Sequence, residues 1–221
     1  MEDDRNGGSN MTKWEYGGAY KKYPLDDEEP YIFDDGSIVQ VHDIFNPLPE
    51  FMKKADLVFV DPPWNQGNMT SFYTKADKVN TFKYEPFYKR IFECIQEISP
   101  KMAFVEVGKE YLPDFIIEMR KIYKYVTFYN SSYYHRDINR CYIVQGSDKR
   151  LNLRLDDMDE EDIIAWITEN VEYDCIADLC MGRGLVGLYS YKNNKRFVGT
   201  ELNHKRLSVL IERIEDEKRN A

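Results

Sequence analysis

Apolar residues recur along this chain in two patterns: short unbroken runs, and longer stretches in which every third or fourth position is apolar. Short runs rich in Val, Ile and Leu are typical of strands buried on both faces of a sheet, and the longer spacing is typical of a helix with one buried side. The runs predict seven strands, at residues 37–42, 57–60, 102–107, 126–131, 141–145, 175–179 and 196–200. The spaced stretches predict helices at residues 47–54, 84–99, 113–124, 159–171, 185–193 and 203–217.

Strands that alternate with helices are typical of a doubly wound α/β fold. We therefore expect a seven-stranded, mostly parallel sheet with helices on both faces. No helix separates residues 126–131 from residues 141–145, so these two strands are expected to form an antiparallel pair late in the chain. Residues 65–82 are polar and have no period, which predicts a long loop.

The beginning of the chain is polar and contains two pairs of glycines and a run of four acids. Such a composition favours a segment that is frayed or that orders on a partner. We therefore expect residues 1–35 to form a polar arm, although its aromatic side chains could pack on a surface, and residues 36–221 to form one domain.

The composition indicates a location inside the cell. Hydrophobic residues make up 43% of the 221, but no apolar run approaches the ~18 residues of a membrane span. The first residues lack the basic and apolar regions of a signal peptide. Four cysteines without CxxC spacing favour buried thiols in a reducing compartment over disulfides or zinc. We expect a cytoplasmic protein that has no membrane contact and no structural metal.

The charge is acidic overall and basic in one region. A net charge of −9 argues against a protein that binds nucleic acid over its whole surface. Residues 119–154 carry eight basic and two acidic side chains, which suits a polyanion held at one face, or an ordinary solvated run. The candidates for contacts to a nucleic-acid backbone are Arg136, Arg140, Lys149 and Arg150.

An unusual turn, Asp61-Pro62-Pro63-Trp64, follows the strand at residues 57–60. Proline cannot donate a sheet hydrogen bond and keeps the preceding residue extended, so the strand ends here and the next residues project stiffly. An acceptor-only carboxylate and a flat indole are thereby presented at the carboxyl edge of the sheet, where open α/β folds bind ligands. A rigid strand exit without further function is the simpler alternative.

A second candidate site lies where the strand at residues 175–179 meets the following helix. Asp178 ends the strand, Gly182 and Gly184 leave the backbone accessible, and Glu201 ends the next strand at an offset suited to ribose hydroxyls. An acid before the glycines would repel a pyrophosphate and attract a cationic amino-acid group. The pattern therefore favours S-adenosylmethionine over NAD, although glycine turns of this kind also occur in proteins without a cofactor.

Together these segments resemble the amino-methyltransferases, which methylate exocyclic nitrogens of nucleic-acid bases. Residues 61–64 match the family's catalytic pattern (D/N/S)PP(Y/F/W), residues 178–184 resemble its cofactor motif D-P-F-x-G-x-G, and residues 197–203 resemble its ribose strand F-x-G-x-E-x-N. The catalytic motif comes first, as in the permuted (beta) class. The chain departs from the cofactor motif at Leu179-Cys180, which replace Pro-Phe, and at Arg183, which replaces a small residue.

The resemblance implies a Rossmann-like methyltransferase domain that acts on adenine N6 in DNA, since the DPPW motif is similar to that of adenine-N6 enzymes. It implies that Asp61 and Pro62 orient the amine and that Trp64 stacks on a flipped base. The implied catalytic residues are Asp61, Pro62, Pro63 and Trp64. The implied cofactor residues are Asp43, Ile44, Asp61, Asp178, Cys180, Gly182, Gly184, Glu201, Leu202 and Asn203.

Other functions remain open at this point. A related enzyme could act on RNA adenine, on cytosine N4 or on a protein glutamine, and a non-catalytic subunit could keep the fold and bind a partner. The interval between the two motifs is short for a separate target-recognition domain, which suggests a homodimer or a partner subunit. The sequence does not determine the target sequence, the strand state or the biological role.

Overall fold

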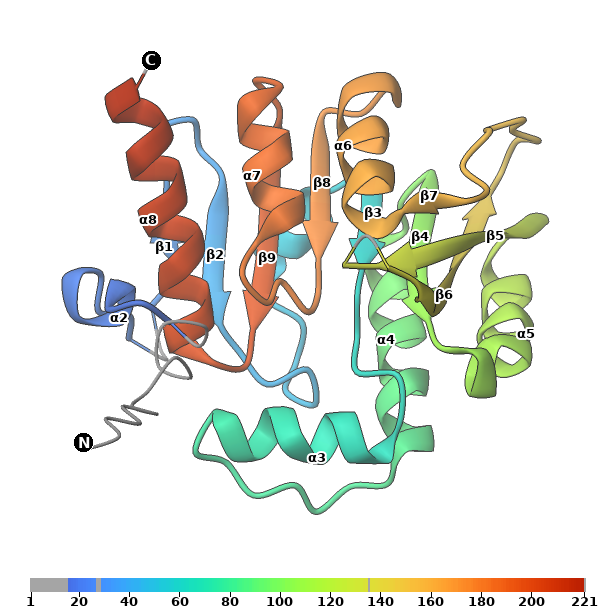
Figure 1. Cartoon of the computed structure of the whole chain (residues 1–221), viewed down its shortest axis with the longest axis horizontal. Coiled ribbons are helices and arrows are strands. Elements are labelled where there is room, and N and C mark those ends of the chain that lie inside the picture. The colour runs from blue at the N-terminus through green and yellow to red at the C-terminus, as the bar shows by residue number, and fades with distance from the viewer. Residues whose placement is uncertain (1–15, 27–28, 135, 221) are drawn as a thin grey trace, which may run out of the picture.

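A mixed sheet of nine strands forms the centre of the described part of the molecule (Figure 1). The structure is a computed structural model, and it describes residues 16–26, 29–134 and 136–220. The order of the strands across the sheet is β1-β2-β9-β8-β3-β4-β6-β5-β7. In chain order they are β1 (Tyr31–Ile32), β2 (Ile38–Val41), β3 (Leu57–Val60), β4 (Met102–Val107), β5 (Tyr125–Tyr133), β6 (Arg136–Ser147), β7 (Met158–Asp159), β8 (Cys175–Asp178) and β9 (Arg196–Glu201).

The central strands β2, β9, β8, β3 and β4 run parallel, and β6 runs antiparallel to both β4 and β5. The predicted antiparallel pair is therefore confirmed, but the predicted seven-stranded, mostly parallel sheet is corrected to a mixed sheet of nine described strands. The additional strands β1 and β7 have two residues each. Segments this short contain no run of apolar residues, so an apolar pattern cannot reveal them.

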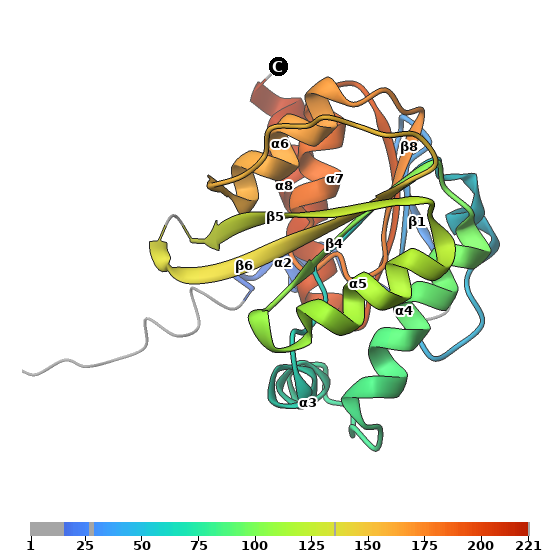
Figure 2. The same cartoon turned by 90° about the vertical axis from the view of Figure 1, so that its right-hand side faces the viewer.

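Helices cover both faces of the sheet (Figures 1 and 2). They are α2 (Ala19–Lys22), the 3-10 helix η1 (Glu50–Lys54), α3 (Gln66–Lys75), α4 (Tyr84–Ile98), the 3-10 helix η2 (Lys109–Tyr111), α5 (Leu112–Ile122), α6 (Glu160–Asn170), α7 (Leu185–Lys192) and α8 (His204–Asn220). Helices α4 and α5 pack on one face, and α6, α7 and α8 pack on the other. Within the described residues, no helix is long and apolar enough to cross a membrane.

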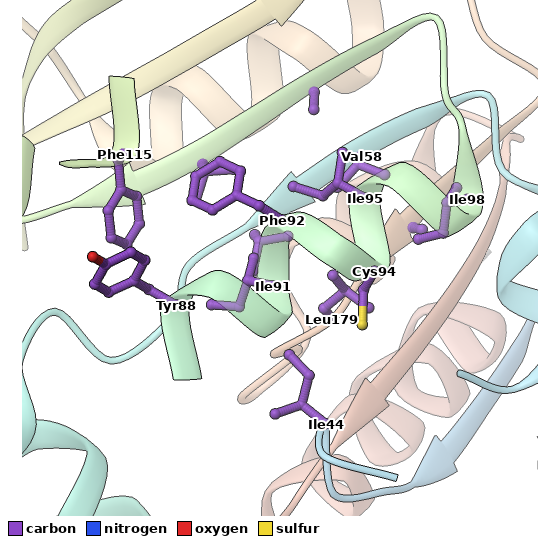
Figure 3. Packing of buried hydrophobic residues seen from close by; sticks show 14 of the residues in the cluster. Ile44, Val58, Tyr88, Ile91, Phe92, Cys94, Ile95, Ile98, Phe115 and Leu179 are labelled. Atoms are coloured by element: carbon purple, nitrogen blue, oxygen red, sulfur yellow. The ribbon is translucent and has the colours of Figure 1, made fainter. Parts of the chain in front are cut away.

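Alternate residues of each central strand face the two helical layers. In β3, Val58 and Val60 belong to the core that α4 covers, where Ile95 lies close to Val58 (Figure 3). Leu57 and Phe59 belong to the core on the opposite face, under α6, α7 and α8. The same alternation decides on which face a polar residue at a strand end comes to lie.

Residues 65–82 contain the helix α3, so the prediction of a continuous loop there is wrong. The helix begins where the Asn65 side chain accepts a hydrogen bond from the Asn68 amide over 2.9 Å. Of its ten residues only Met69 and Tyr73 are buried, too few to produce a visible helical spacing of apolar positions. Helix α3 lies across the carboxyl ends of the parallel strands (Figure 1).

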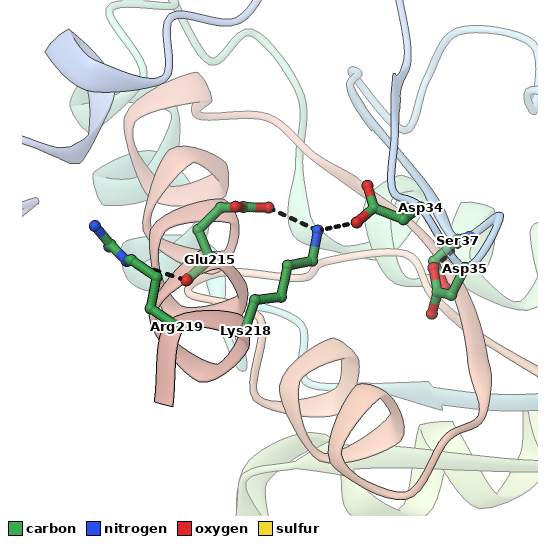
Figure 4. A network of polar contacts seen from close by, with 6 residues as sticks. All are labelled: Asp34, Asp35, Ser37, Glu215, Lys218 and Arg219. Carbon is green, nitrogen blue, oxygen red and sulfur yellow. Dashed lines mark hydrogen bonds and ion pairs between the residues drawn. The ribbon is translucent and has the colours of Figure 1, made fainter. Parts of the chain in front are cut away.

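The described residues of the predicted N-terminal arm pack against the domain. Helix α2 contacts α8, β1 pairs with β2, and Phe33 is buried. Lys218 of α8 donates a hydrogen bond to Asp34 over 2.7 Å (Figure 4). These contacts are isolated anchors, which do not stand out in a polar segment. Residues 1–15 and 27–28 of the arm lie outside the described residues.

Candidate active site

A cavity of about 890 Å³ opens at the carboxyl ends of β3 and β8. Its volume lies within the range of roughly 300–1,000 Å³ that is typical of small-molecule sites. It is lined by the DPPW motif (Asp61-Pro62-Pro63-Trp64), by the turn after β8 and by the first turn of α6. The two candidate sites of the sequence therefore form one cavity, because β3 and β8 are adjacent parallel strands.

The DPPW motif is held in place from two sides. The Trp64 indole Nε1 donates a hydrogen bond to Asp61 Oδ1 over 3.2 Å. The hydroxyl of Tyr84, at the start of α4, donates to the Pro63 carbonyl over 2.7 Å. The Trp64 ring lies against Gly108 after β4, where an added Cβ atom would come within 3.3 Å of the ring. The motif is therefore a rigid turn in which the indole orients one oxygen of the carboxylate.

A series of aromatic rings leads from the DPPW motif to the surface. Trp64 meets Tyr133 edge-on with ring centres 5.6 Å apart, and Tyr133 contacts Tyr134 with ring centres 4.1 Å apart. Tyr134 is 68% exposed and has a φ of 60°, the left-handed conformation that a tight hairpin uses. Aromatic rings along one wall of a cavity suit a planar ligand, which can stack on them.

The turn after β8 contains two glycines with different tasks. Gly182 and Gly184 have φ values of 54° and 75°, which favour glycine. A Cβ atom on Gly184 would come within 2.6 Å of Leu210, whereas a Cβ atom on Gly182 would meet nothing nearer than 3.9 Å. Gly184 thus permits close packing of this turn on α8, and Gly182 leaves open space beside the cavity.

Glu201, the last residue of β9, is buried and held by two backbone amides. Its Oε2 accepts a hydrogen bond from the Gly182 amide over 2.7 Å, and its Oε1 accepts one from the Asn203 amide over 3.0 Å. An ionised carboxylate offers about four acceptor positions. Each oxygen therefore retains capacity for a further donor, such as a ribose hydroxyl.

Asp178, the last residue of β8, is also buried at the cavity, and its Oδ1 accepts a hydrogen bond from the Cys180 amide over 3.0 Å. Burial raises the pKa of this carboxyl well above its ordinary value, and the charges of Asp61 and Glu201 raise it further. A cationic group beside these acids would favour their ionised forms. The charge distribution therefore suits a positively charged ligand.

Seven of the predicted cofactor residues line the cavity and three do not. Those that line it are Ile44, Asp61, Asp178, Cys180, Gly182, Glu201 and Leu202. Gly184 packs against Leu210 of α8, while Asp43 and Asn203 make hydrogen bonds to residues of α3. Asp43 Oδ1 accepts a hydrogen bond from the Tyr73 hydroxyl over 2.9 Å, and Asn203 Nδ2 donates one to the Lys75 carbonyl over 2.9 Å. These two polar side chains therefore position the helix that lies beside the cavity.

The four predicted phosphate contacts lie at opposite edges of the sheet. Strand β6 runs antiparallel to β4, so that Ser147 pairs with the first residue of β4. Arg136 and Arg140, near the start of β6, therefore lie beyond the carboxyl end of β4, on the side of the DPPW motif. Lys149 and Arg150 follow the end of β6 at the other edge. Only Arg136 and Arg140 therefore lie on the side of the candidate site, a division that local composition does not reveal because it does not give the direction of a strand.

Two acids that the sequence analysis did not single out lie beside Asp61. One carboxyl oxygen from each of Asp61, Glu106 and Glu160 lies within 4.8 Å of the other two, and we call these residues the carboxyl triad. Glu106 belongs to β4 and is 0% exposed, and Glu160 is the first residue of α6 and is 6% exposed. The available signal was a single acid, Glu106, inside an otherwise apolar strand.

Burial raises the pKa of every member of the carboxyl triad. It raises the pKa of Asp61 to about 6, against the opposing effects of the Trp64 hydrogen bond and the Arg206 guanidinium. Burial and the charge of Asp61 raise the pKa of Glu160 to about 9. The pKa of Glu106 rises well above its ordinary value, first through burial and then through the charges of Asp61 and Glu160. Asp61 therefore ionises before Glu160 as the pH rises, and burial favours the neutral form of Glu106.

Arg206 of α8 is a further cavity residue that the sequence analysis did not single out. Its guanidinium lies over the ring of Phe72 of α3, 4.5 Å from the ring centre. This stacking holds a positive charge at the cavity, where it lowers the pKa of Asp61. No local motif marks the residue, since the contact depends on how α3 and α8 meet.

No family model matches this chain, and no curated protein matches it. Several solved structures are similar to it in fold. TTHA0409 of Thermus thermophilus, named for a presumed DNA modification methylase activity, aligns with a TM-score of 0.57 and 13% identity over 81% of this chain and 94% of its own. The M1.HpyAVI–SAM complex aligns with a TM-score of 0.53 and 13% identity over 80% and 98%. The cytosine-N4-specific PvuII DNA methyltransferase aligns with a TM-score of 0.51 and 10% identity over 83% and 93%. At these identities the similarity establishes a shared fold.

Proposed function

We propose that this protein is an S-adenosylmethionine-dependent DNA methyltransferase that methylates the exocyclic N6 amine of adenine. The observation that carries the proposal is the single cavity formed by the DPPW motif together with Asp178, Gly182 and Glu201, residues that lie far apart in the sequence. The fold shared with DNA methyltransferases supports it. The choice of cofactor is supported by two of those structures, since M1.HpyAVI and TTHA0409 have both been solved with S-adenosylmethionine.

The residues around the glycine turn would hold the cofactor, which when bound supplies a methyl group on a positively charged sulfur. In this proposal Glu201 accepts hydrogen bonds from the ribose hydroxyls, and Asp178 attracts the ammonium group of the amino-acid part. The open space beside Gly182 lets the ligand approach the backbone. The acids fit such a cation, because its charge offsets the cost of ionising them in a buried place.

The DPPW motif would present the acceptor amine. The lone pair of adenine N6 is delocalised into the ring, so the free amine is a poor nucleophile. Asp61 and the Pro62 carbonyl each accept one N–H, which turns the nitrogen towards tetrahedral geometry and directs its lone pair at the methyl group. A pKa of about 6 favours the ionised form of Asp61 at neutral pH, and a carboxylate accepts an N–H more strongly than a neutral carboxyl does. Positioning and fixed charges then supply most of the rate.

Trp64 would hold the base outside the duplex. Flipping a base costs a few kcal/mol, and stacking on an aromatic side chain returns about 1–3 kcal/mol. The indole is already oriented by its hydrogen bond to Asp61 and by its edge contact with Tyr133. Base and amine are therefore positioned by one rigid turn.

Transfer of a labelled methyl group from the cofactor to unmethylated DNA tests the proposal. We expect N6-methyladenine with the wild-type protein and a rate lower by about 100-fold or more in Asp61→Ala, the loss typical when a group that orients the reaction is removed. Calorimetry should show that this variant still binds the cofactor. Asp148→Ala, which removes an exposed acid at the other edge of the sheet, is the matched control. No methylation by the wild type, or equal yields from wild type and Asp61→Ala, would contradict the proposal.

Cytosine N4 is the second candidate acceptor, because the PvuII enzyme shares the fold and is cytosine-N4-specific. Digestion of the methylated DNA to nucleosides separates the two products, and parallel assays on RNA test adenine outside DNA. A non-catalytic subunit would bind no cofactor at micromolar concentration.

We further propose that a second copy or a partner subunit completes target recognition. Light scattering that shows a monomer, together with turnover assays that show full activity, would exclude this.

A further inference from the structure

Glu106 is a fully buried acid whose two carboxyl oxygens have no hydrogen-bond partner of ordinary geometry among the described residues; the Cys141 thiol and the Glu160 carboxyl are the groups near enough to interact with them. An isolated carboxylate in such a place is strongly disfavoured, because burial removes its hydration and nothing replaces it. Its carboxyl group is directed at Asp61 and Glu160, with an oxygen of each within 4.8 Å. Glu106 is therefore a neutral acid whose O–H can be shared with the other two members of the carboxyl triad.

The sheet register brings these acids together. Val60 of β3 pairs with Val105 of β4, so the next residues, Asp61 and Glu106, are neighbours on the same face. That face is the one under α6, whose first residue is Glu160. The cluster is thus built by three elements of regular structure and not by a loop.

Several titratable and charged groups face the carboxyl triad from the other elements packed around it. They are Cys141 of β6, Tyr133 of β5, Asp159 of β7, Glu161 of α6, Asp178 of β8 and Arg206 of α8. Arg206 is the one cation in this set. Acids predominate, so ionisation of a second or third member of the triad is opposed from most directions. One negative charge and two protons are the state that these surroundings favour near neutral pH.

We propose that the carboxyl triad of Asp61, Glu106 and Glu160 is a proton-sharing unit that takes up, through Asp61, the proton lost by the methylated amine, and releases it to the cavity through Glu160. The inference rests on the proposed function for the identity of the proton donor. It goes beyond that function by assigning Glu106 and Glu160 as positioning residues that act through Asp61.

The proton and the electrons balance in this step. The acceptor nitrogen forms a bond to the methyl carbon while the carbon–sulfur bond breaks and leaves its electron pair on sulfur. The nitrogen is then positively charged and passes one proton to Asp61, keeping the electron pair of that N–H bond. The triad, now neutral, loses one proton from Glu160 to water in the cavity. A shift of protons within the triad restores the charge on Asp61; separations of up to 4.8 Å are within reach of a bridging water.

A divalent cation is the other way to compensate three clustered acids. The positive charge of the proposed cofactor would repel a second cation in the same cavity. Asp61 would also be occupied by the metal at the moment when it must accept an N–H from the amine. Proton sharing avoids both conflicts, and the experiment below distinguishes it from metal binding.

The first test reads protonation directly and needs no methyl acceptor. Carbon-13 NMR of protein labelled at the aspartate and glutamate carboxyl carbons should show that the carboxyls of Glu106 and Glu160 are among those that remain protonated near neutral pH. Glu106→Gln and Glu160→Gln should each remove one of these signals. Titration of every carboxyl below about pH 5 would overturn the proposal, and so would selective broadening of the triad signals by micromolar Mn²⁺.

The second test measures single-turnover methyl transfer across pH at saturating cofactor. Gln keeps the size of Glu but cannot carry the proton, so Glu106→Gln and Glu160→Gln should each slow the step about tenfold or more and shift the acid limb of the profile. Their affinity for the cofactor should change less than about twofold. Glu106→Asp, which restores a carboxyl, should recover part of the rate, and Glu169→Gln, an exposed position on α6, is the control.

The two tests separate the failure of this inference from the failure of the proposed function. Unchanged rates and profiles in both Gln variants of an active enzyme overturn the inference alone. A wild-type protein without methyl transfer overturns the proposed function, and the NMR titration then decides whether the triad shares protons.

Discussion

Glu160 begins α6 and lines the cavity, where burial raises the pKa of its carboxyl from the ordinary 4.5 to about 9. Between these two values the folded protein holds a proton that the unfolded chain has released. Folding therefore takes up a proton in this range, and the free energy of unfolding falls as the pH rises. Each pH unit in the window costs about 1 kcal/mol per proton taken up.

Replacing Glu160 by Gln removes this proton linkage. We expect the stability of Glu160→Gln, relative to the wild type, to improve by about 1 kcal/mol per pH unit between about pH 5 and pH 8. Urea unfolding at several pH values measures the free energies. Glu169→Gln should follow the wild type throughout. If wild type and Glu160→Gln instead run parallel with pH, the acid is ionised in the folded protein.

At the residue scale, the candidate site residues that the sequence could locate are those with unusual sequence neighbours. Asp61 is followed by two prolines and a tryptophan, and Asp178 is followed by a glycine turn, so each stands out within a few positions. Glu106 stands out only as one acid among apolar residues, and its partners come from β3 and α6. Its role depends on register and on the packing of α6, which local composition does not contain.

The glycine turn after β8 contains two glycines that have similar backbone conformations but different packing neighbours. Gly182 and Gly184 both have positive φ, but only Gly184 is packed so closely that a Cβ atom would overlap Leu210. We expect Gly184→Ala to lower the free energy of unfolding by about 2–4 kcal/mol, through backbone strain together with overpacking. Gly182→Ala should cost about 1 kcal/mol, the lower end of backbone strain alone.

Chemical unfolding of the two alanine variants, each compared with the wild type, measures this difference. Binding of the proposed cofactor provides the complementary readout, since the new methyl group of Gly182→Ala enters the space beside the cavity. Equal losses of stability in the two variants would show that packing on α8 does not distinguish the two glycines.

Among the elements, those with many buried apolar residues were predictable and those held by isolated contacts were not. Strands β3, β4, β8 and β9 are buried along most of their length, so each forms an apolar run. Helix α3 is mostly exposed. It is fixed by the bond from Tyr73 to Asp43 and by the bond from Asn203 to the Lys75 carbonyl. Such contacts join segments distant in sequence and leave no periodic pattern.

For the molecule as a whole, the DPPW motif and the Asp178 turn follow two strands that are far apart in the sequence but are paired in the sheet, β3 and β8. In the proposed function each segment requires the other, since a motif that presents an amine needs a methyl donor beside it. The placement of the basic residues carried no such constraint. Their position depends on β6 reversing direction, and only the sheet topology reveals this.

In the proposed function, the arrangement of charge over the described residues predicts where DNA binds. Arg136 and Arg140 lie at the edge that carries the DPPW motif, whereas Lys149 and Arg150 lie at the other edge. Replacing Arg136 and Arg140 together by Gln should weaken DNA binding and reduce the slope of log affinity against log salt by up to about 2, roughly 0.9 for each phosphate that is no longer neutralised. Arg140 Nη1 lies 3.7 Å from Asp157 Oδ1, but an exposed ion pair of this kind is weak and competes little with a phosphate for the guanidinium.

Replacing Lys149 and Arg150 together by Gln changes the net charge by the same amount at the opposite edge, and it should leave both the affinity and the salt slope near the wild-type values. Fluorescence anisotropy of a labelled duplex at several salt concentrations measures both quantities for the two double variants. Because the pairs are matched in charge, an effect of net charge alone would weaken binding equally in both. A greater loss in the Lys149 and Arg150 variant would place the DNA at the edge away from Asp61 and Trp64, where no base could reach the cavity.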